Sequence, residues 1–113
     1  MKVEVLYIAG CPNHKPAVTR VQQALGEAGL SADIEEMEVR DAAMAQRVCF
    51  LGSPSVRVNG LDVEKEARAT QSFGFGCRSY AEAARRTGLP SLELIRKALL
   101  ESAPASEQGG TKP

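Results

Sequence analysis

The sequence predicts a single α/β domain with a four-stranded mixed sheet and helices on both faces of that sheet. Two observations lead to this prediction. Apolar runs typical of strands alternate along the chain with stretches whose apolar residues recur every three or four positions, as on one face of a helix. The resulting order is strand, helix, strand, helix, hairpin, helix, and 113 residues suffice for one small domain.

The first predicted strand covers residues 2–9, and the first predicted helix runs from Pro16 to Ala28. Apolar side chains occupy both faces of the strand, with Val3, Val5 and Tyr7 on one and Leu6 and Ile8 on the other. Such a strand is expected at the centre of a sheet. If Asn13 caps the helix, Pro16 falls in its first turn and costs little, whereas a start at Pro12 would place Pro16 in the second turn.

A weaker strand follows over residues 32–39, and three nearby glutamates indicate that it is exposed or at an edge of the sheet. Asp41 is then expected to cap a short helix that ends at Gly52. The side chains expected to face inward from this helix are Met44, Val48 and Leu51.

Residues 53–63 predict an antiparallel hairpin. Asn59-Gly60 is the strongest short signal for a type I′ turn, so residues 55–59 and 61–63 are expected to pair with each other. Because Pro54 directly precedes a strand, we expect a cis peptide bond after Ser53.

Residues 64–88 are predicted to form a long loop in which Tyr80 to Arg86 make a short helix. The large apolar groups available to hold this loop against the domain are Phe73, Phe75 and Tyr80. The nearest open surface is the end of the sheet that carries Cys11 and Pro54, so we expect the loop to dock there.

The last helix is predicted from Pro90 to Ser102. Its expected apolar face consists of Leu92, Ile95, Leu99 and Leu100. Residues 103–113 are rich in Pro, Gly and Ser and predict a disordered tail, which leaves residues 1–102 as the folded domain.

The composition argues against several classes of protein. Lys and Arg balance Asp and Glu at 14 each, which argues against a nucleic-acid stripe or a basic membrane-binding face. No apolar stretch is long enough to cross a bilayer, and the N-terminus does not resemble a signal peptide. Three cysteines are an odd number for a secreted disulfide scaffold, so we expect a cytoplasmic protein whose thiols are reduced by default.

Cys11 is the first candidate for chemistry, because it lies at the turn between a predicted strand and a predicted helix. The amide groups and the positive end of the dipole at a helix N-terminus favour a thiolate over a thiol. A buried structural cysteine in a turn is the alternative interpretation.

Several motifs resemble the thioredoxin fold. Cys11-Pro12 resembles the start of a glutaredoxin Cys-Pro-x-Cys site, and Ser53-Pro54 resembles the cis-proline position of that fold. More narrowly, the chain is similar to a group of small bacterial thioredoxin-like proteins that are often labelled alkylmercury lyase-like or selenoprotein-related. The segments that carry this resemblance are Cys11-Pro12-Asn13, Phe50 to Gly60 and Gly74 to Tyr80. The resemblance departs at position 14, where His14 stands in place of a second cysteine and excludes a local dithiol switch.

With this resemblance added, Cys11 is the expected catalytic nucleophile of a redox site. Cys77 is its candidate resolving partner, because the long loop could fold back over the Cys11 turn; alternatively Cys77 is a small buried loop residue. The expected site-shaping residues are Pro12, Asn13, His14, Ser53, Pro54 and Arg78. His14 either promotes the thiolate or accepts a proton, or it is an exposed residue without a role. Arg78 either assists Cys77 or holds an anion, or it is a solvated surface group. Cys49 is expected to be a small core residue without chemistry.

The leading hypothesis for function is a thiol-disulfide oxidoreductase that acts on a disulfide substrate or partner protein as a monomer or weak dimer. It needs no bound cofactor, although glutathione could serve as a co-substrate. One alternative is a binder of a soft metal such as mercury through Cys11 and Cys77, in which Asp62 or Glu64 would supply a proton for carbon–mercury cleavage. Another alternative is a non-catalytic interaction module with the same fold.

Overall fold

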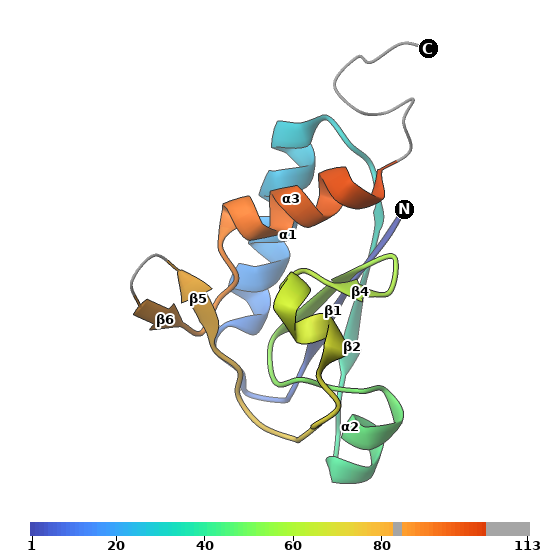
Figure 1. Cartoon of the computed structure of the whole chain (residues 1–113), viewed down its shortest axis with the longest axis vertical. Helices are drawn as coiled ribbons and strands as arrows, with labels where there is room; N and C mark the ends of the chain where they lie inside the picture. Colours follow the sequence, from blue (N-terminus) through green and yellow to red (C-terminus); the bar gives the residue numbers. More distant parts are fainter. Residues whose placement is uncertain (83–84, 104–113) are drawn as a thin grey trace.

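The computed structural model describes residues 1–82 and 85–103, and its central element is a four-stranded mixed sheet (Figure 1). The strands of this sheet are β1 (Lys2–Tyr7), β2 (Asp33–Glu38), β3 (Ser55–Val58) and β4 (Leu61–Asp62), in the order β2-β1-β3-β4. The helices are α1 (His14–Ala28), α2 (Ala42–Arg47) and α3 (Leu92–Ser102), with a 3₁₀ helix η1 (Lys65–Ala69). The predicted α/β class with a four-stranded mixed sheet is therefore confirmed.

Strand β1 lies inside the sheet, as its two apolar faces predicted. It pairs in parallel with β2, which forms an edge, and antiparallel with β3 in a register that places Val5 opposite Val56. The turn between β3 and β4 has positive φ angles of 50° at Asn59 and 85° at Gly60, as a type I′ turn requires. The peptide bond between Ser53 and Pro54 is cis, as predicted.

One face of the sheet is covered by α1 and α3, which cross each other in Figure 1. The core between them and the sheet is built from Val3, Val5, Val56 and Val58 of the sheet, Ala17, Val21, Ala24 and Leu25 of α1, and Ile95, Ala98 and Leu99 of α3. Full burial of one such aliphatic side chain contributes about 1.5–3 kcal/mol. The expectation that Leu100 faces inward is wrong, because α3 turns Ala98 and Leu99 to the core and leaves Leu100 39% exposed.

The other face of the sheet is covered at one end by the short helix α2. There Leu6 of β1 packs with Val39, Ala45 and Phe50 in a second, smaller core. Asp41 caps α2 as predicted, since its carboxylate accepts a hydrogen bond of 2.8 Å from the amide of Met44. The rest of this face is less covered and contains the cavity described below.

The helix boundaries differ slightly from the predicted ones. Helix α1 begins at His14 after Asn13, so Pro16 falls in the first turn, although the Asn13 side chain makes no capping hydrogen bond. Helix α3 begins at Leu92 rather than Pro90, because the Ser91 hydroxyl accepts the amide of Leu94 at 3.0 Å and so caps the helix.

The segment 64–88 is more ordered than a loop, and the short helix predicted from Tyr80 to Arg86 is wrong. The chain forms η1 and then an antiparallel pair of strands, β5 (Tyr80–Glu82) and β6 (Arg85–Thr87). The side chain of Tyr80 is fully buried in the main core. Tertiary packing therefore outweighs the helix propensity of this stretch. The predicted tail lies outside the described residues from position 104, and Ala103 is buried at the end of α3.

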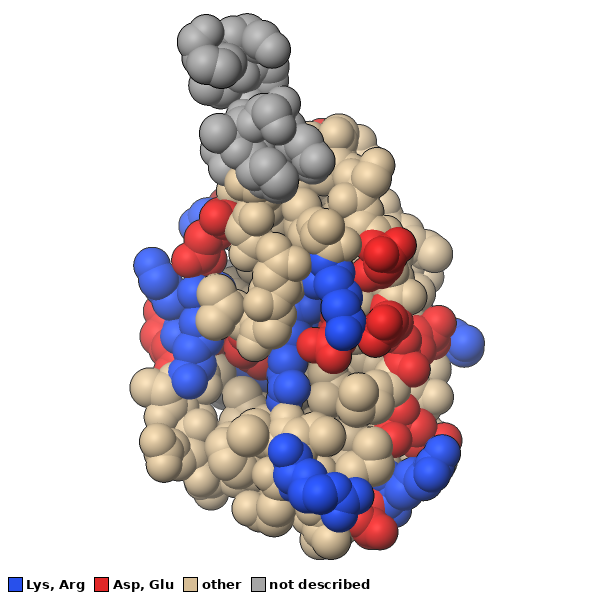
Figure 2. All heavy atoms as spheres, turned by 90° about the vertical axis from the view of Figure 1, so that its right-hand side faces the viewer, with Lys and Arg blue, Asp and Glu red and all other residues tan. Residues whose placement is uncertain are grey.

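No helix among residues 1–82 and 85–103 is long and apolar enough to cross a membrane. Figure 2 shows one face of the molecule, on which Lys and Arg side chains alternate with Asp and Glu side chains. The described part of this face therefore carries no stripe of a single charge sign.

Candidate thiol site around Ser53

Cys11 lies in the turn between β1 and α1. Its amide donates a hydrogen bond of 3.2 Å to the carbonyl of Ile8, and its own carbonyl accepts one of 3.3 Å from the amide of His14. These bonds fix Cys11 two residues before the N-cap position of α1. Its side chain is a free thiol and the residue is partly buried, so the structure leaves it accessible for reaction.

Ser53 connects this turn to the segment that carries Cys77. The amide of Ile8 donates to the Ser53 hydroxyl at 3.1 Å, which ties Ser53 to the end of β1. On its other side, the Ser53 amide donates to the carbonyl of Gly76 at 2.8 Å and the Ser53 carbonyl accepts from the amide of Arg78 at 3.0 Å. Cys77 is therefore paired with Ser53 as a short parallel bridge. The expected docking of the loop at the Pro54 end of the sheet is confirmed by these bonds.

The loop is held there mainly by its backbone. The amide of Gly74 donates to the carbonyl of Phe50 at 3.2 Å, and the Gln46 side chain donates to the carbonyl of Phe73 at 2.7 Å. Among the three aromatic side chains expected to dock, Tyr80 is buried, Phe73 is partly buried and Phe75 is 46% exposed. The expectation that Phe75 anchors the loop is wrong. Cys77 is an exposed free thiol.

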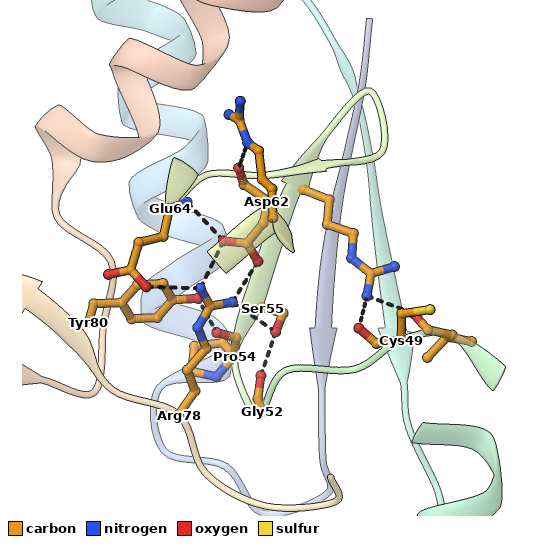
Figure 3. A network of polar contacts seen from close by, with 11 residues as sticks. Cys49, Gly52, Pro54, Ser55, Asp62, Glu64, Arg78 and Tyr80 are labelled. Carbon is orange, nitrogen blue, oxygen red and sulfur yellow. Dashed lines mark hydrogen bonds and ion pairs between the residues drawn. The ribbon is translucent and has the colours of Figure 1, made fainter. Parts of the chain in front are cut away.

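Arg78 is the centre of a buried polar network (Figure 3). Its guanidinium donates to both carboxylate oxygens of Asp62, at 2.6 and 2.8 Å, and to Glu64 at 3.3 Å. It also donates to the Ser55 hydroxyl at 3.2 Å, and it lies 4.2 Å from the centre of the Tyr80 ring. Burial acts to lower the pKa of Arg78, but the hydrogen bonds and charge of Asp62 outweigh it and raise the pKa overall.

This network corrects two sequence expectations. The Arg78 side chain is only 6% exposed, so it is neither a solvated surface group nor an open anion site. Both oxygens of Asp62 are engaged by Arg78, which removes Asp62 as a freely available proton donor. The sequence contained no local signal for the pair, because Asp62 stands between Leu61 and Val63 and the alternation of a strand predicts that it faces outward.

Tyr80 supports the same end of the sheet, because its hydroxyl donates a hydrogen bond to the carbonyl of Pro54. Burial raises the pKa of the Tyr80 phenol well above its ordinary value, and the nearby charge of Arg78 only partly offsets this. The folded protein therefore holds the phenol proton at a pH at which the unfolded chain releases it.

We expect stability to fall in strong alkali because of Tyr80. A raised folded-state pKa stabilises the fold fully below the unfolded pKa of about 10, and this stabilisation is lost as the pH rises above that value. The expected slope above about pH 10 is about 1 kcal/mol per pH unit, measured by urea unfolding. Tyr80→Phe should be less stable near neutrality by about 1 kcal/mol because the Pro54 carbonyl loses its donor, yet it should decline less steeply in alkali. Equal slopes for both proteins would contradict this assignment.

His14 and its neighbours are engaged with groups other than Cys11. The His14 ring stacks on Tyr7 with 3.5 Å between ring centres, and its Nε2 lies 2.6 Å from a carboxylate oxygen of Glu36. Only 13% of the His14 side chain is exposed, so the alternative expectation of an exposed histidine without a role does not hold either. Pro12 is exposed. The Asn13 amide group packs so closely on Gly88 that a Cβ there would lie 2.5 Å from its Nδ2.

Cys49 is exposed, so its predicted place in the core is wrong. It follows the C-cap of α2 with a positive φ of 57°, and this backbone conformation turns its side chain away from the core that Ala45 and Phe50 build. Glycine is the usual residue at such a position, and its absence from the sequence removed the signal that the helix ends there.

No group of three or more His, Cys, Asp or Glu side chains that could hold a metal ion occurs among the described residues. Comparisons of the chain with known protein families, with curated proteins and with solved structures found no match.

Proposed function

We propose that this chain is a thiol-based redox protein with a thioredoxin-like arrangement, in which Cys11 is the nucleophile and Cys77 resolves the mixed disulfide. One observation carries this proposal. Ser53 is hydrogen-bonded to Ile8 on one side and to Gly76 and Arg78 on the other. The Cys11 turn and the Cys77 segment, which are far apart in the sequence and each carry a free thiol, are thus both linked to Ser53.

The fold supports the proposal. The sheet has a parallel β1–β2 pair, an antiparallel β1–β3 pair and a β3–β4 hairpin, and this order is compatible with a thioredoxin-like topology. Cys11 lies where the first strand passes into the first helix, and 15-residue helix α1 directs its N-terminal end toward that turn. A helix N-terminus stabilises negative charge, and a thiolate is the reactive form of cysteine.

The proposed reaction is thiol–disulfide exchange in two steps. The Cys11 thiolate attacks one sulfur of a substrate disulfide, forms a mixed disulfide and releases the other half of the substrate as a thiolate. The Cys77 thiolate then attacks the Cys11 sulfur, forms the Cys11–Cys77 disulfide and releases the second thiolate. The substrate gains two electrons that the two cysteines lose, and a low-molecular-weight thiol such as glutathione returns the protein to its dithiol form.

The test uses dithiodipyridine, a small disulfide whose thiopyridone product is measured by its absorbance. The reagent is added at less than one equivalent relative to the reduced protein. Cys49→Gly serves as the background for all variants, since glycine tolerates the positive φ at that position and the exposed third thiol is removed. The background protein is expected to release two thiopyridones per reagent consumed and to yield a Cys11–Cys77 peptide by mass mapping.

The single variants separate the two roles. Cys77→Ser should release one thiopyridone per reagent consumed and retain a stable adduct on Cys11. In Cys11→Ser, the rapid release of thiopyridone should be absent. If Cys77 reacts faster than Cys11, or if no Cys11–Cys77 link forms while both thiols react, the proposed reaction is wrong. That result would favour the non-catalytic interaction module.

A further inference from the structure

A cavity of about 530 Å³ lies on the face of the sheet that α2 only partly covers. The sheet contributes Glu4, Arg57 and Asp62 to its lining, α2 contributes Arg47, and η1 contributes Arg68. Cys11 does not line this cavity. Any ligand bound here is therefore separate from the proposed reaction at Cys11.

Most of the charges in this lining are already neutralised. Both oxygens of Asp62 are held by Arg78, as described above. The guanidinium of Arg68 pairs with both oxygens of Glu101, at 3.1 and 3.0 Å. Glu4 lies 3.9 Å from the ammonium group of Lys2. Each of these three lining charges therefore has an oppositely charged partner.

The remaining two charges are both positive. Arg57 donates from Nη2 alone, at 2.6 Å to the carbonyl of Val48 and at 2.8 Å to that of Cys49. Its Nε and Nη1 groups have no hydrogen-bond acceptor within the described part of the chain, and a guanidinium carries five N–H donors. Arg47 is exposed and makes no hydrogen bond or ion pair with any described residue. Two guanidinium groups thus line one cavity without an ion pair to any described carboxylate. Glu4 lies opposite Arg57 across the β1–β3 ladder, but its ion pair is with Lys2.

Apolar side chains also line this cavity. Met37, Leu61 and Phe73 line it, and Leu61 is 45% exposed although it is a large aliphatic residue. A cavity of this volume lies within the range of small-molecule sites, in which apolar walls are combined with a few polar groups that orient the ligand.

We propose that this cavity binds a small organic anion with an apolar body, in which Arg47 and Arg57 hold the carboxylate and Leu61 and Phe73 contact the apolar part. Guanidinium groups recognise carboxylates through charge-assisted hydrogen bonds, often in pairs. The cavity volume of about 530 Å³ suits a compact ligand better than an extended acidic peptide.

The test is an amide NMR titration with naphthoate, which combines a carboxylate with an aromatic body. Naphthamide is the control ligand, since it has nearly the same shape without the charge. We expect naphthoate to shift resonances around Arg47, Arg57 and Leu61, and naphthamide to bind more weakly. High salt should weaken the binding of naphthoate and leave that of naphthamide unchanged.

Two variants test the guanidinium groups. Arg47→Gln is expected to weaken naphthoate binding about fivefold, a moderate factor because the side chain is exposed. Arg57→Lys keeps the charge but loses the planar fork and should also weaken binding. Arg40→Gln is the matched control, because Arg40 is exposed and does not line the cavity.

Cys49 supplies an independent readout, since its exposed thiol lines the cavity. Saturating naphthoate should slow the alkylation of Cys49 and leave that of Cys11 unchanged. Equal binding of naphthoate and naphthamide, no effect of either arginine variant, or shifts confined to other faces would overturn the proposal. An acidic peptide that shifts the same resonances when naphthoate does not would overturn the assignment to a small ligand.

Discussion

Arg78→Met is expected to lower the free energy of unfolding by about 3–5 kcal/mol, because it leaves the buried carboxylate of Asp62 without its charged partner and with only the amide of Glu64, at 2.8 Å, as a hydrogen-bond donor. Asp62 is 5% exposed and receives two hydrogen bonds from Arg78. For a domain of about 100 residues, a loss of this size lowers Tm by roughly 15–30 °C. Urea unfolding followed by circular dichroism measures the effect.

The double variant Arg78→Met with Asp62→Leu distinguishes the loss of the ion-pair energy from the cost of burying an unpaired carboxylate. Replacing both partners of a buried ion pair with apolar residues is often close to neutral, so the double variant should recover much of the stability that the single variant loses. Arg96→Met is the control, because Arg96 is exposed on α3 and should change stability by less than about 0.5 kcal/mol. A double variant that is no more stable than Arg78→Met alone would show that Asp62 is not the source of the cost.

The sequence predicted the sheet well because local patterns determine it. Alternating apolar residues identify β1 as a central strand, Asn59-Gly60 specifies the hairpin turn, and Asp41 specifies the start of α2. Each of these signals acts within a few residues. Structure that is determined by interactions within a few residues can be predicted without knowledge of the fold.

The interior of segment 64–88 was not predictable in the same way. Arg78 is buried only because Asp62, 16 residues earlier, lies beside it in the folded chain. Tyr80 is drawn into a strand conformation by its burial in the core and by the carbonyl of Pro54, against the helix propensity of its neighbours. Both outcomes depend on contacts that form after the sheet is in place.

The roles of Cys11 and Cys77 in the candidate site stay predictions. The motifs predicted a cis-proline beside the Cys11 turn, and the structure adds that Ser53 is hydrogen-bonded to both that turn and the Cys77 segment. The roles of His14 and Cys49 could not be read from the sequence. The stacking of His14 on Tyr7 leaves no local pattern in the sequence. The same holds for the left-handed backbone of Cys49, because the residue at that position is not glycine.

The second large effect is expected from Gly52→Ala. Gly52 has a φ of +117°, which side chains rarely adopt, and an added Cβ would lie 2.7 Å from the Cβ of Arg78 and 3.1 Å from the carbonyl oxygen of Cys77. The backbone conformation costs about 1–2 kcal/mol and the forced displacement about 1–3 kcal/mol more, so we expect a loss of about 2–5 kcal/mol in the free energy of unfolding.

Gly60→Ala separates these two contributions. Gly60 also has a positive φ, of +85°, but a Cβ there would meet no atom within 4 Å. It should therefore carry only the backbone cost, and the difference between the two variants measures the contact with the Cys77 segment. Hydrogen exchange at the amides of Ser53 and Arg78 should become faster in Gly52→Ala and stay unchanged in Gly60→Ala. If the two variants lose equal stability, the close packing of Gly52 against Arg78 contributes nothing. If Gly52→Ala alone also lowers the yield of the Cys11–Cys77 link, the register of the Cys77 segment beside Ser53 is what allows the two thiols to meet.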